Sequence, residues 1–137
     1  MINNRSVPAN VILPHLPYSE VGAAIEWLTG NFGFVEHYRY GGDYDSPHGA
    51  QLRFGDAWVM LSAGFGGHFV LTLFVDDLDQ QHERVRAAGV RIVEELNETI
   101  YGELQFGVLD LDGNKWLFAK HAKDVSPADW GATIAKG

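Results

Sequence analysis

Two stretches of this chain follow the same plan: a strand, a tight turn and a second strand. In residues 101–121 the turn is Asp112-Gly113, a pair favoured in type I′ hairpins. In residues 50–63 the turn is Gly55-Asp56, followed by the apolar residues 58–61. A repeated hairpin predicts a chain built from two copies of one unit, each burying its apolar face against the other copy.

Before the hairpin of residues 50–63, the sequence predicts a strand, a helix and another strand. Residues 6–16 are apolar and strand-like, with prolines that place part of the strand at a sheet edge. Ser19 is expected to cap the helix and Gly30 to end it. The apolar face of the helix has the spacing i, i+3, i+4, i+7 and consists of Val21, Ala24, Ile25 and Leu28. Residues 34–41 predict the next strand.

The same order restarts after the glycine-rich residues 64–67, which we expect to join the two units. Residues 68–75 and 91–98 predict strands. Between them, Asp76 or Asp77 caps a helix, Gln80 completes a capping box with Asp77, and Gly89 ends the helix. The predicted fold class is α+β. A first βαβββ module covers residues 6–65, a second covers 68–125, and a C-terminal helical turn and tail cover 126–137.

Composition narrows the classes of partner. The net charge is −8 and no cluster of Lys or Arg exists, which argues against a nucleic-acid surface. No apolar run approaches the roughly 20 residues that cross a bilayer, so no membrane partner is expected. No apolar segment follows the N-terminal Met, so we expect no signal peptide and a cytoplasmic location. The absence of cysteine excludes disulfides, thiolate zinc sites and a cysteine nucleophile.

The tandem plan resembles the vicinal oxygen chelate superfamily, which includes glyoxalase I, the bleomycin-resistance proteins and the extradiol dioxygenases. The resemblance runs from roughly Pro8 to Val125. It is carried by AIEWL at residues 24–28, GNFGF at 30–34 and DGNKW at 112–116. It implies that the two modules form a curved mixed sheet around a cleft for a small molecule or a metal, usually in a homodimer.

In the metal-dependent members of that superfamily, four strands each supply one His or Glu. The positions in this chain that match by spacing are all apolar: Leu13, Met60, Val70 and Leu117. Only a soft metal would bind here, weakly, through Met60. The resemblance therefore implies a protein without a metal or other cofactor. Such a protein would bind an aromatic or antibiotic-like small molecule, as in the bleomycin-resistance branch.

Histidines near those positions leave a second hypothesis open. Strand side chains repeat with period two, so His15, His68 and His121 share the strand faces of the apolar positions. His15 and His68 would be neighbours if the two opening strands run antiparallel about a pseudo-twofold axis. The alternative function is a glyoxalase-type lyase or dioxygenase. Its displaced site at His15 and His68 would hold Fe, Mn, Ni or Zn.

The strand faces expected to line the cleft carry further candidates. Glu103 is a candidate general base, which adds a third hypothesis of an enzyme without metal. A ligand would be bound by stacking and a few hydrogen bonds, from His15, Trp58, Met60, Ser62, His68, Thr72, Gln105 and His121. The competing interpretation is that Trp58 only fills the half-barrel and that the polar side chains are solvated. The sequence leaves both a binding protein and an enzyme open.

Overall fold

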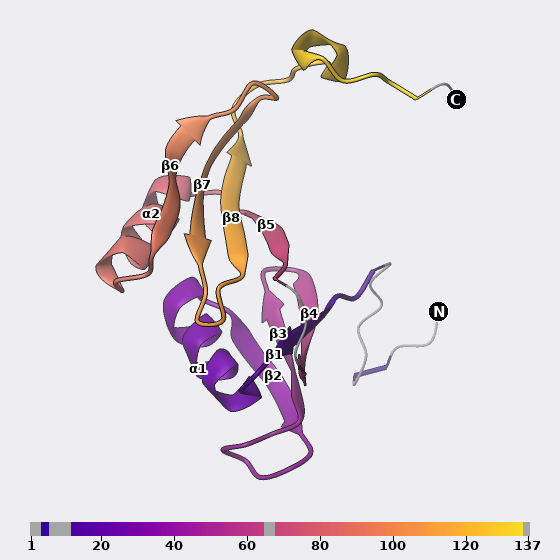
Figure 1. Cartoon of the computed structure of the whole chain (residues 1–137), viewed down its shortest axis with the longest axis vertical. Helices are drawn as coiled ribbons and strands as arrows, with labels where there is room; N and C mark the ends of the chain where they lie inside the picture. The colour runs from indigo at the N-terminus through magenta and orange to yellow at the C-terminus, as the bar shows by residue number, and fades with distance from the viewer. Residues whose placement is uncertain (1–3, 6–11, 65–67, 136–137) are drawn as a thin grey trace. The chain divides into compact units, whose positions relative to one another are not determined.

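The computed structural model describes residues 4–5, 12–64 and 68–135 and divides into two units, Met1–Gly67 and His68–Gly137. Each unit carries a four-stranded sheet and one α-helix (Figure 1). The strand order is β1-β4-β3-β2 in unit 1 and β5-β8-β7-β6 in unit 2. In both sheets the opening strand pairs parallel with the last strand, and the other pairs are antiparallel. The predicted α+β fold with tandem βαβββ modules is confirmed.

Unit 1 begins with a shorter strand than the sequence predicts. Residues 6–11 of the predicted strand lie outside the described residues, as do residues 65–67 of the predicted joint. The turn Gly55-Asp56 joins two strands as predicted, because Phe54 pairs directly with Ala57. The elements are β1 (His15–Tyr18), α1 (Val21–Phe32), β2 (Val35–Tyr40), β3 (Gly49–Phe54) and β4 (Ala57–Ala63).

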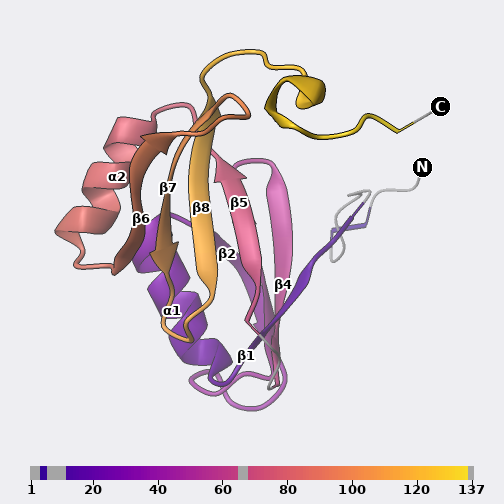
Figure 2. The same cartoon turned by 45° about the horizontal axis from the view of Figure 1, so that its top comes forward.

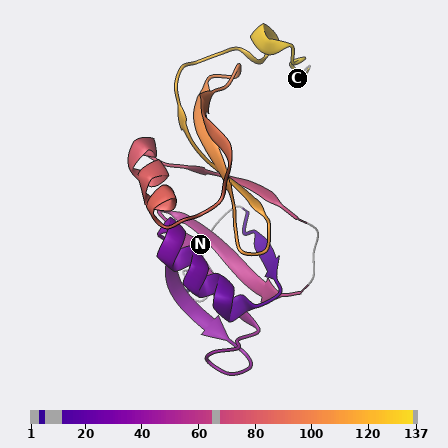
Figure 3. The ribbon, with the colours of Figure 1, turned by 60° about the vertical axis from the view of Figure 1, so that its left-hand side comes forward.

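The helix α1 lies across one face of the sheet of unit 1 (Figure 3). Its predicted apolar face is buried, with Phe32 added one turn beyond Leu28. Both predicted ends were wrong. The N-cap is Glu20 rather than Ser19, and its side chain makes no capping hydrogen bond. The helix runs past Gly30 because Phe32 extends the apolar stripe. It then ends at Gly33, whose φ of 91° is a left-handed conformation that glycine adopts without strain.

Unit 2 repeats this order of elements. Asp77 is the N-cap of its helix, and its carboxylate accepts a 3.0 Å hydrogen bond from the backbone N–H of Gln80. The helix has its C-cap at Ala88, directly before the predicted stop at Gly89. It packs on one face of the sheet (Figure 2), where the ring of His82 meets that of Phe106. The elements are β5 (Val70–Phe74), α2 (Leu78–Ala87), β6 (Ile92–Glu98), β7 (Glu103–Leu109), β8 (Lys115–His121) and the 3₁₀ helix η1 (Pro127–Trp130).

The loop between β7 and β8 differs from the predicted type I′ turn. Leu109 pairs with Lys115, so residues 110–114 form the connection. A type I′ turn needs a positive φ at both central residues, but among the described residues only glycines have one. The loop is organised instead by the buried carboxylate of Asp110. It accepts hydrogen bonds from the backbone N–H of Asn114 at 2.9 Å and from the indole N–H of Trp116 at 2.9 Å.

Each sheet has one face toward its helix and one face without a helix, which we call the open face. In unit 1, Arg39 lies on the helix side, because it bonds to Glu26 of α1. Its cross-strand partner Ala50 and the next partner Leu61 are buried there. Side chains alternate along a strand, so the residues between them face the open side. No helix in the described ranges is long and apolar enough to cross a membrane.

Candidate functional site

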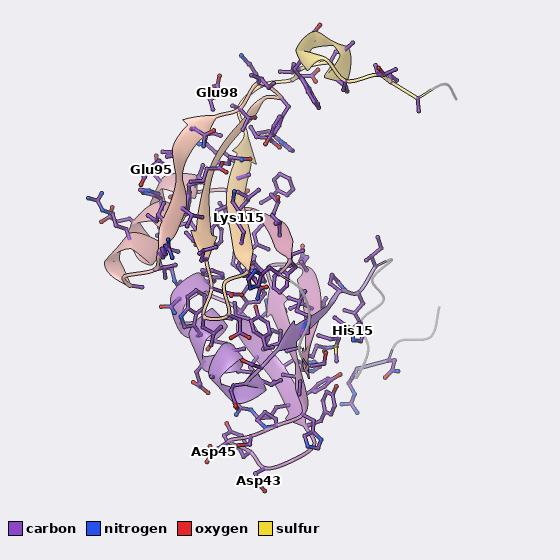
Figure 4. The ribbon with its side chains drawn as sticks, viewed as in Figure 1. His15, Asp43, Asp45, Glu95, Glu98 and Lys115 are labelled. Carbon is purple, nitrogen blue, oxygen red and sulfur yellow. The ribbon has the colours of Figure 1, made fainter. Side chains whose placement is uncertain are left out.

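The open face of unit 1 carries four of the sequence-predicted ligand-binding residues. Trp58, Met60 and Ser62 alternate along β4, with Val59 and Leu61 buried on the other side. His15, labelled in Figure 4, is an exposed residue at the start of β1 and pairs with Met60. The structure thus brings His15 and Met60 together, while Trp58 and Ser62 lie on either side of Met60 along the strand. All four share one sheet face.

A histidine that the sequence analysis did not single out completes this face. His37 lies on β2, where the register passes from the pair Glu36–Leu52 to the pair Tyr38–Gln51. It is therefore the additional residue of a β-bulge, an irregularity that re-aims a side chain. The His37 ring centroid lies 5.4 Å from that of Trp58, edge to face.

The imidazole of His37 is held by a buried glutamine. Gln51 is only 1% exposed, and its Oε1 lies 2.6 Å from Nδ1 of His37. The other end of the amide donates from Nε2 to the sulfur of Met60 at 3.4 Å. We name the group His37, Gln51, Trp58 and Met60 the aromatic cluster. Its polar atoms are oriented by a side chain that is itself fixed, which favours recognition of one ligand geometry.

The open face of unit 2 is charged instead. Lys115, labelled in Figure 4, donates from Nζ to Glu94 at 3.0 Å, and Gln105 donates to the same carboxylate at 2.7 Å. Burial raises the pKa of Glu94. The hydrogen bonds from Gln105, Lys115 and Asn97 outweigh that effect and lower the pKa below its ordinary value. We name Glu94, Gln105 and Lys115 the charged cluster.

Two sequence-predicted residues form a pair at the far end of the same hairpin. Nδ1 of His121 lies 2.8 Å from both carboxylate oxygens of Glu103. The imidazole is 78% exposed and the carboxylate 15% exposed. A hollow of about 360 Å³ adjoins the pair and is lined by Tyr101, Glu103, His121, Lys123, Asp124 and Val125. The carboxylate accepts from Nδ1–H, so the exposed imidazole presents Nε2 to solvent, and this arrangement suits proton transfer.

The remaining predicted residues of unit 2 do not join one cluster. Thr72 is exposed on β5 opposite Leu117 of β8, and Val70 lies opposite Lys115. His68 lies before β5, where its ring is close to Gly113 of the β7–β8 loop. His15 belongs to unit 1 and His68 to unit 2, so their proximity stays a prediction.

The strand registers show which residues lie opposite the positions that correspond to metal ligands. Met60 lies opposite His15, and Leu13 is two residues before that pair. In the same way Leu117 lies opposite Thr72, two residues after Val70. Among the described residues, no group of three or more His, Cys, Asp or Glu side chains is arranged to hold a metal ion.

Four residues of these clusters were missed by the sequence analysis: His37, Gln51, Glu94 and Lys115. The alternating strand pattern does not predict the position of His37, because that position depends on a bulge that shifts the alternation. Gln51 was assigned to a strand, but its burial follows from the neighbours across the sheet. Glu94 and Lys115 are distant in sequence and meet only through β7 between them, where Gly107 leaves room.

Comparison with known proteins agrees with this architecture. The family model of the Glyoxalase/Bleomycin resistance protein/Dioxygenase superfamily matches residues 10–118. No curated protein matches the sequence. Among solved structures, TioX from Micromonospora sp. ML1 is 29% identical with a TM-score of 0.72, and the match covers 82% of this chain and 99% of that one.

Two further structures share the fold at lower identity. A glyoxalase/bleomycin resistance protein from Streptomyces sp. CB03234 is 23% identical with a TM-score of 0.63, covering 79% of this chain and 97% of that one. Lactoylglutathione lyase from Agrobacterium tumefaciens is 16% identical with a TM-score of 0.67, covering 82% and 93%. The family match spans both βαβββ units, and the chain therefore belongs to the glyoxalase/bleomycin resistance protein/dioxygenase superfamily.

Proposed function

We propose that this protein binds a planar aromatic small molecule on the open face of unit 1 and acts by sequestration, without a resident metal. The observation that carries the proposal is the aromatic cluster. Trp58 is partly exposed on a sheet face without a helix, beside an imidazole that a buried amide holds in place. A mostly apolar surface with a few fixed polar groups is typical of sites for organic ligands.

The chemistry of the residues at the ligand positions supports a site without metal. Leu13, Val70 and Leu117 have no donor atom in their side chains, and the sulfur of Met60 already accepts a hydrogen bond from Gln51. If the positions are taken as the cross-strand pairs instead, they become His15 with Met60 and Thr72 with Leu117. Only His15 among these four is a usual ligand of a divalent metal.

The net charge of −8 supports a cationic or neutral ligand over an anionic one, because long-range attraction raises the local concentration of cations. Proflavine, a planar aromatic cation, is therefore a suitable first probe. Its titration is followed by the shift of its visible absorbance, which the protein does not share. The superfamily resemblance also favours a homodimer, which light scattering of the same sample tests.

The test compares wild type with Trp58→Ala and Trp27→Phe. Trp27 lies on α1 against Phe32 and is the matched control for loss of an indole. We expect proflavine binding in wild type and Trp27→Phe, and a loss of at least tenfold in Trp58→Ala, since losing the stacking contact together with its buried apolar area costs about 1.4 kcal/mol or more. Binding that Trp58→Ala leaves intact would contradict the proposal.

Elemental analysis of the untagged protein addresses the metal. The sample is incubated with Fe(II), Mn, Ni or Zn and then desalted. The proposal expects no retained metal. Near-stoichiometric metal that His15→Ala or His68→Ala removes would favour a lyase or dioxygenase with a displaced site instead.

A further inference from the structure

We propose that His37 determines which aromatic ligands the site accepts. In this inference, which rests on the proposed function, Gln51 fixes the imidazole as the tautomer with its proton on Nδ1. Nε2 is then a hydrogen-bond acceptor beside Trp58. The preferred ligand class is a planar aromatic with a phenolic hydroxyl or a ring N–H.

The tautomer follows from the partners of the Gln51 amide. An amide has one accepting oxygen and one donating nitrogen, and a thioether sulfur can only accept. The end that faces Met60 at 3.4 Å is therefore the nitrogen, and the end that faces His37 at 2.6 Å is the oxygen. An oxygen that only accepts requires a proton on Nδ1 of His37. In a neutral imidazole the other nitrogen then carries the lone pair.

The surroundings of His37 make Nε2 available to a ligand. His37 is exposed, and within the described ranges no side chain or backbone group bonds to its Nε2. Its ring lies 5.4 Å from Trp58 and 5.1 Å from Tyr38, measured between ring centroids. A flat ligand stacked on these rings would carry its edge past the imidazole. Nε2 would thus contact the edge of the ligand, while the rings of Trp58 and Tyr38 would contact its face.

A ligand without a donor at this edge would cover Nε2 and leave it without a partner. Removing an acceptor from water without giving it a partner costs more free energy than an average hydrogen bond contributes. We therefore expect a ligand with a donor to bind about tenfold more tightly than the same ligand with the donor blocked. The pair 2-naphthol and 2-methoxynaphthalene differs by this one feature.

Calorimetric titration of both compounds into wild type and His37→Phe tests the inference. We expect wild type to prefer 2-naphthol by about tenfold and His37→Phe to bind both compounds with similar affinity. Phenylalanine preserves an aromatic ring and removes both nitrogens, that is, the acceptor Nε2 and the Nδ1–H that bonds to Gln51. Equal binding of both compounds to wild type would overturn the assignment of His37 and leave the proposed function standing. If neither compound binds wild type, the proposed function and this inference both fail.

Nitrogen NMR of the histidine rings tests the tautomer directly. At about pH 8.5, where neutral imidazoles prevail, we expect His37 to show a protonated Nδ1 and an unprotonated Nε2. A protonated Nε2 would overturn the inference in wild type, without any variant. Gln51 is a positioning residue, so Gln51→Leu should release the enforced tautomer and reduce the preference for 2-naphthol. Binding of 2-methoxynaphthalene should change less than twofold, which loss of the fold would not allow.

Discussion

The two units share one topology but present different chemistry on their open faces. In unit 1 the face is aromatic, and at its centre the amide of Gln51 joins His37 to Met60. In unit 2 the centre is a carboxylate that accepts from Lys115 and Gln105. The helix sides of both sheets carry the buried apolar residues of each unit. The two units therefore share the buried side that stabilises each of them and differ in the chemistry of the open side.

The two hairpin turns also differ, because one is held by a buried carboxylate and the other is exposed. The largest predicted change in stability lies in the buried one. Asp110→Ala removes the acceptor of the Trp116 indole and the Asn114 backbone, both buried. We expect a loss of about 3 kcal/mol in the free energy of unfolding, because buried donors lose a charged acceptor. Asp56→Ala, in the exposed turn of unit 1, should change it by less than about 0.5 kcal/mol. Urea unfolding measures both, and equal losses would contradict the distinction between the turns.

The difference between the open faces predicts the next effect. Trp58→Ala should weaken proflavine binding at least tenfold. Phe74→Ala is the matched change on unit 2, where the residue is 60% exposed and its ring centroid lies 5.3 Å from that of His121. We expect it to change proflavine binding less than twofold. A larger effect at Phe74 than at Trp58 would move the binding face to unit 2.

The sequence predicted the repeated fold because hydrophobic alternation and turn residues are local signals. The face assignment of Trp58 followed from period two alone. The ends of α1 were wrong because burial of Phe32, a tertiary effect, outweighed the glycine at position 30. The turn Asp112-Gly113 was wrong because Asp110, two residues earlier, organises a longer loop.

The site was harder to predict, since it depends on register. His15 could be placed on a face, but its pairing with Met60 rather than a position two residues away follows from the parallel ladder. His37 owes its place to a bulge, and the partners of Glu94 come from two other strands. The alternation of side chains along a strand assigns each residue to a sheet face. It does not determine which residues of the neighbouring strands it contacts.

The charged cluster should make the stability of unit 2 depend on acid. The folded-state pKa of Glu94 lies below its usual 4.5, so its stabilisation is present above about that pH and is lost as the pH falls through the folded value. Glu94→Gln should cost about 1 kcal/mol near neutral pH and progressively less as the pH falls below about 4.5. Gln51→Glu in unit 1 is not a suitable control, because it adds a charge whereas Glu94→Gln removes one. Glu95→Gln removes an exposed carboxylate from the same strand and is the control variant.

The smallest effect is expected at the pair formed by Glu103 and His121. Its imidazole is 78% exposed, so water and salt screen the interaction. We expect Glu103→Gln to change the free energy of unfolding by less than about 0.5 kcal/mol, well below the change at Glu94. Urea unfolding at low and high salt measures it. A loss above that of Glu94→Gln would mean that the pair is a rigid part of unit 2. The hollow beside His121 would then be as firmly built as the aromatic cluster, and the contrast between the two open faces would narrow.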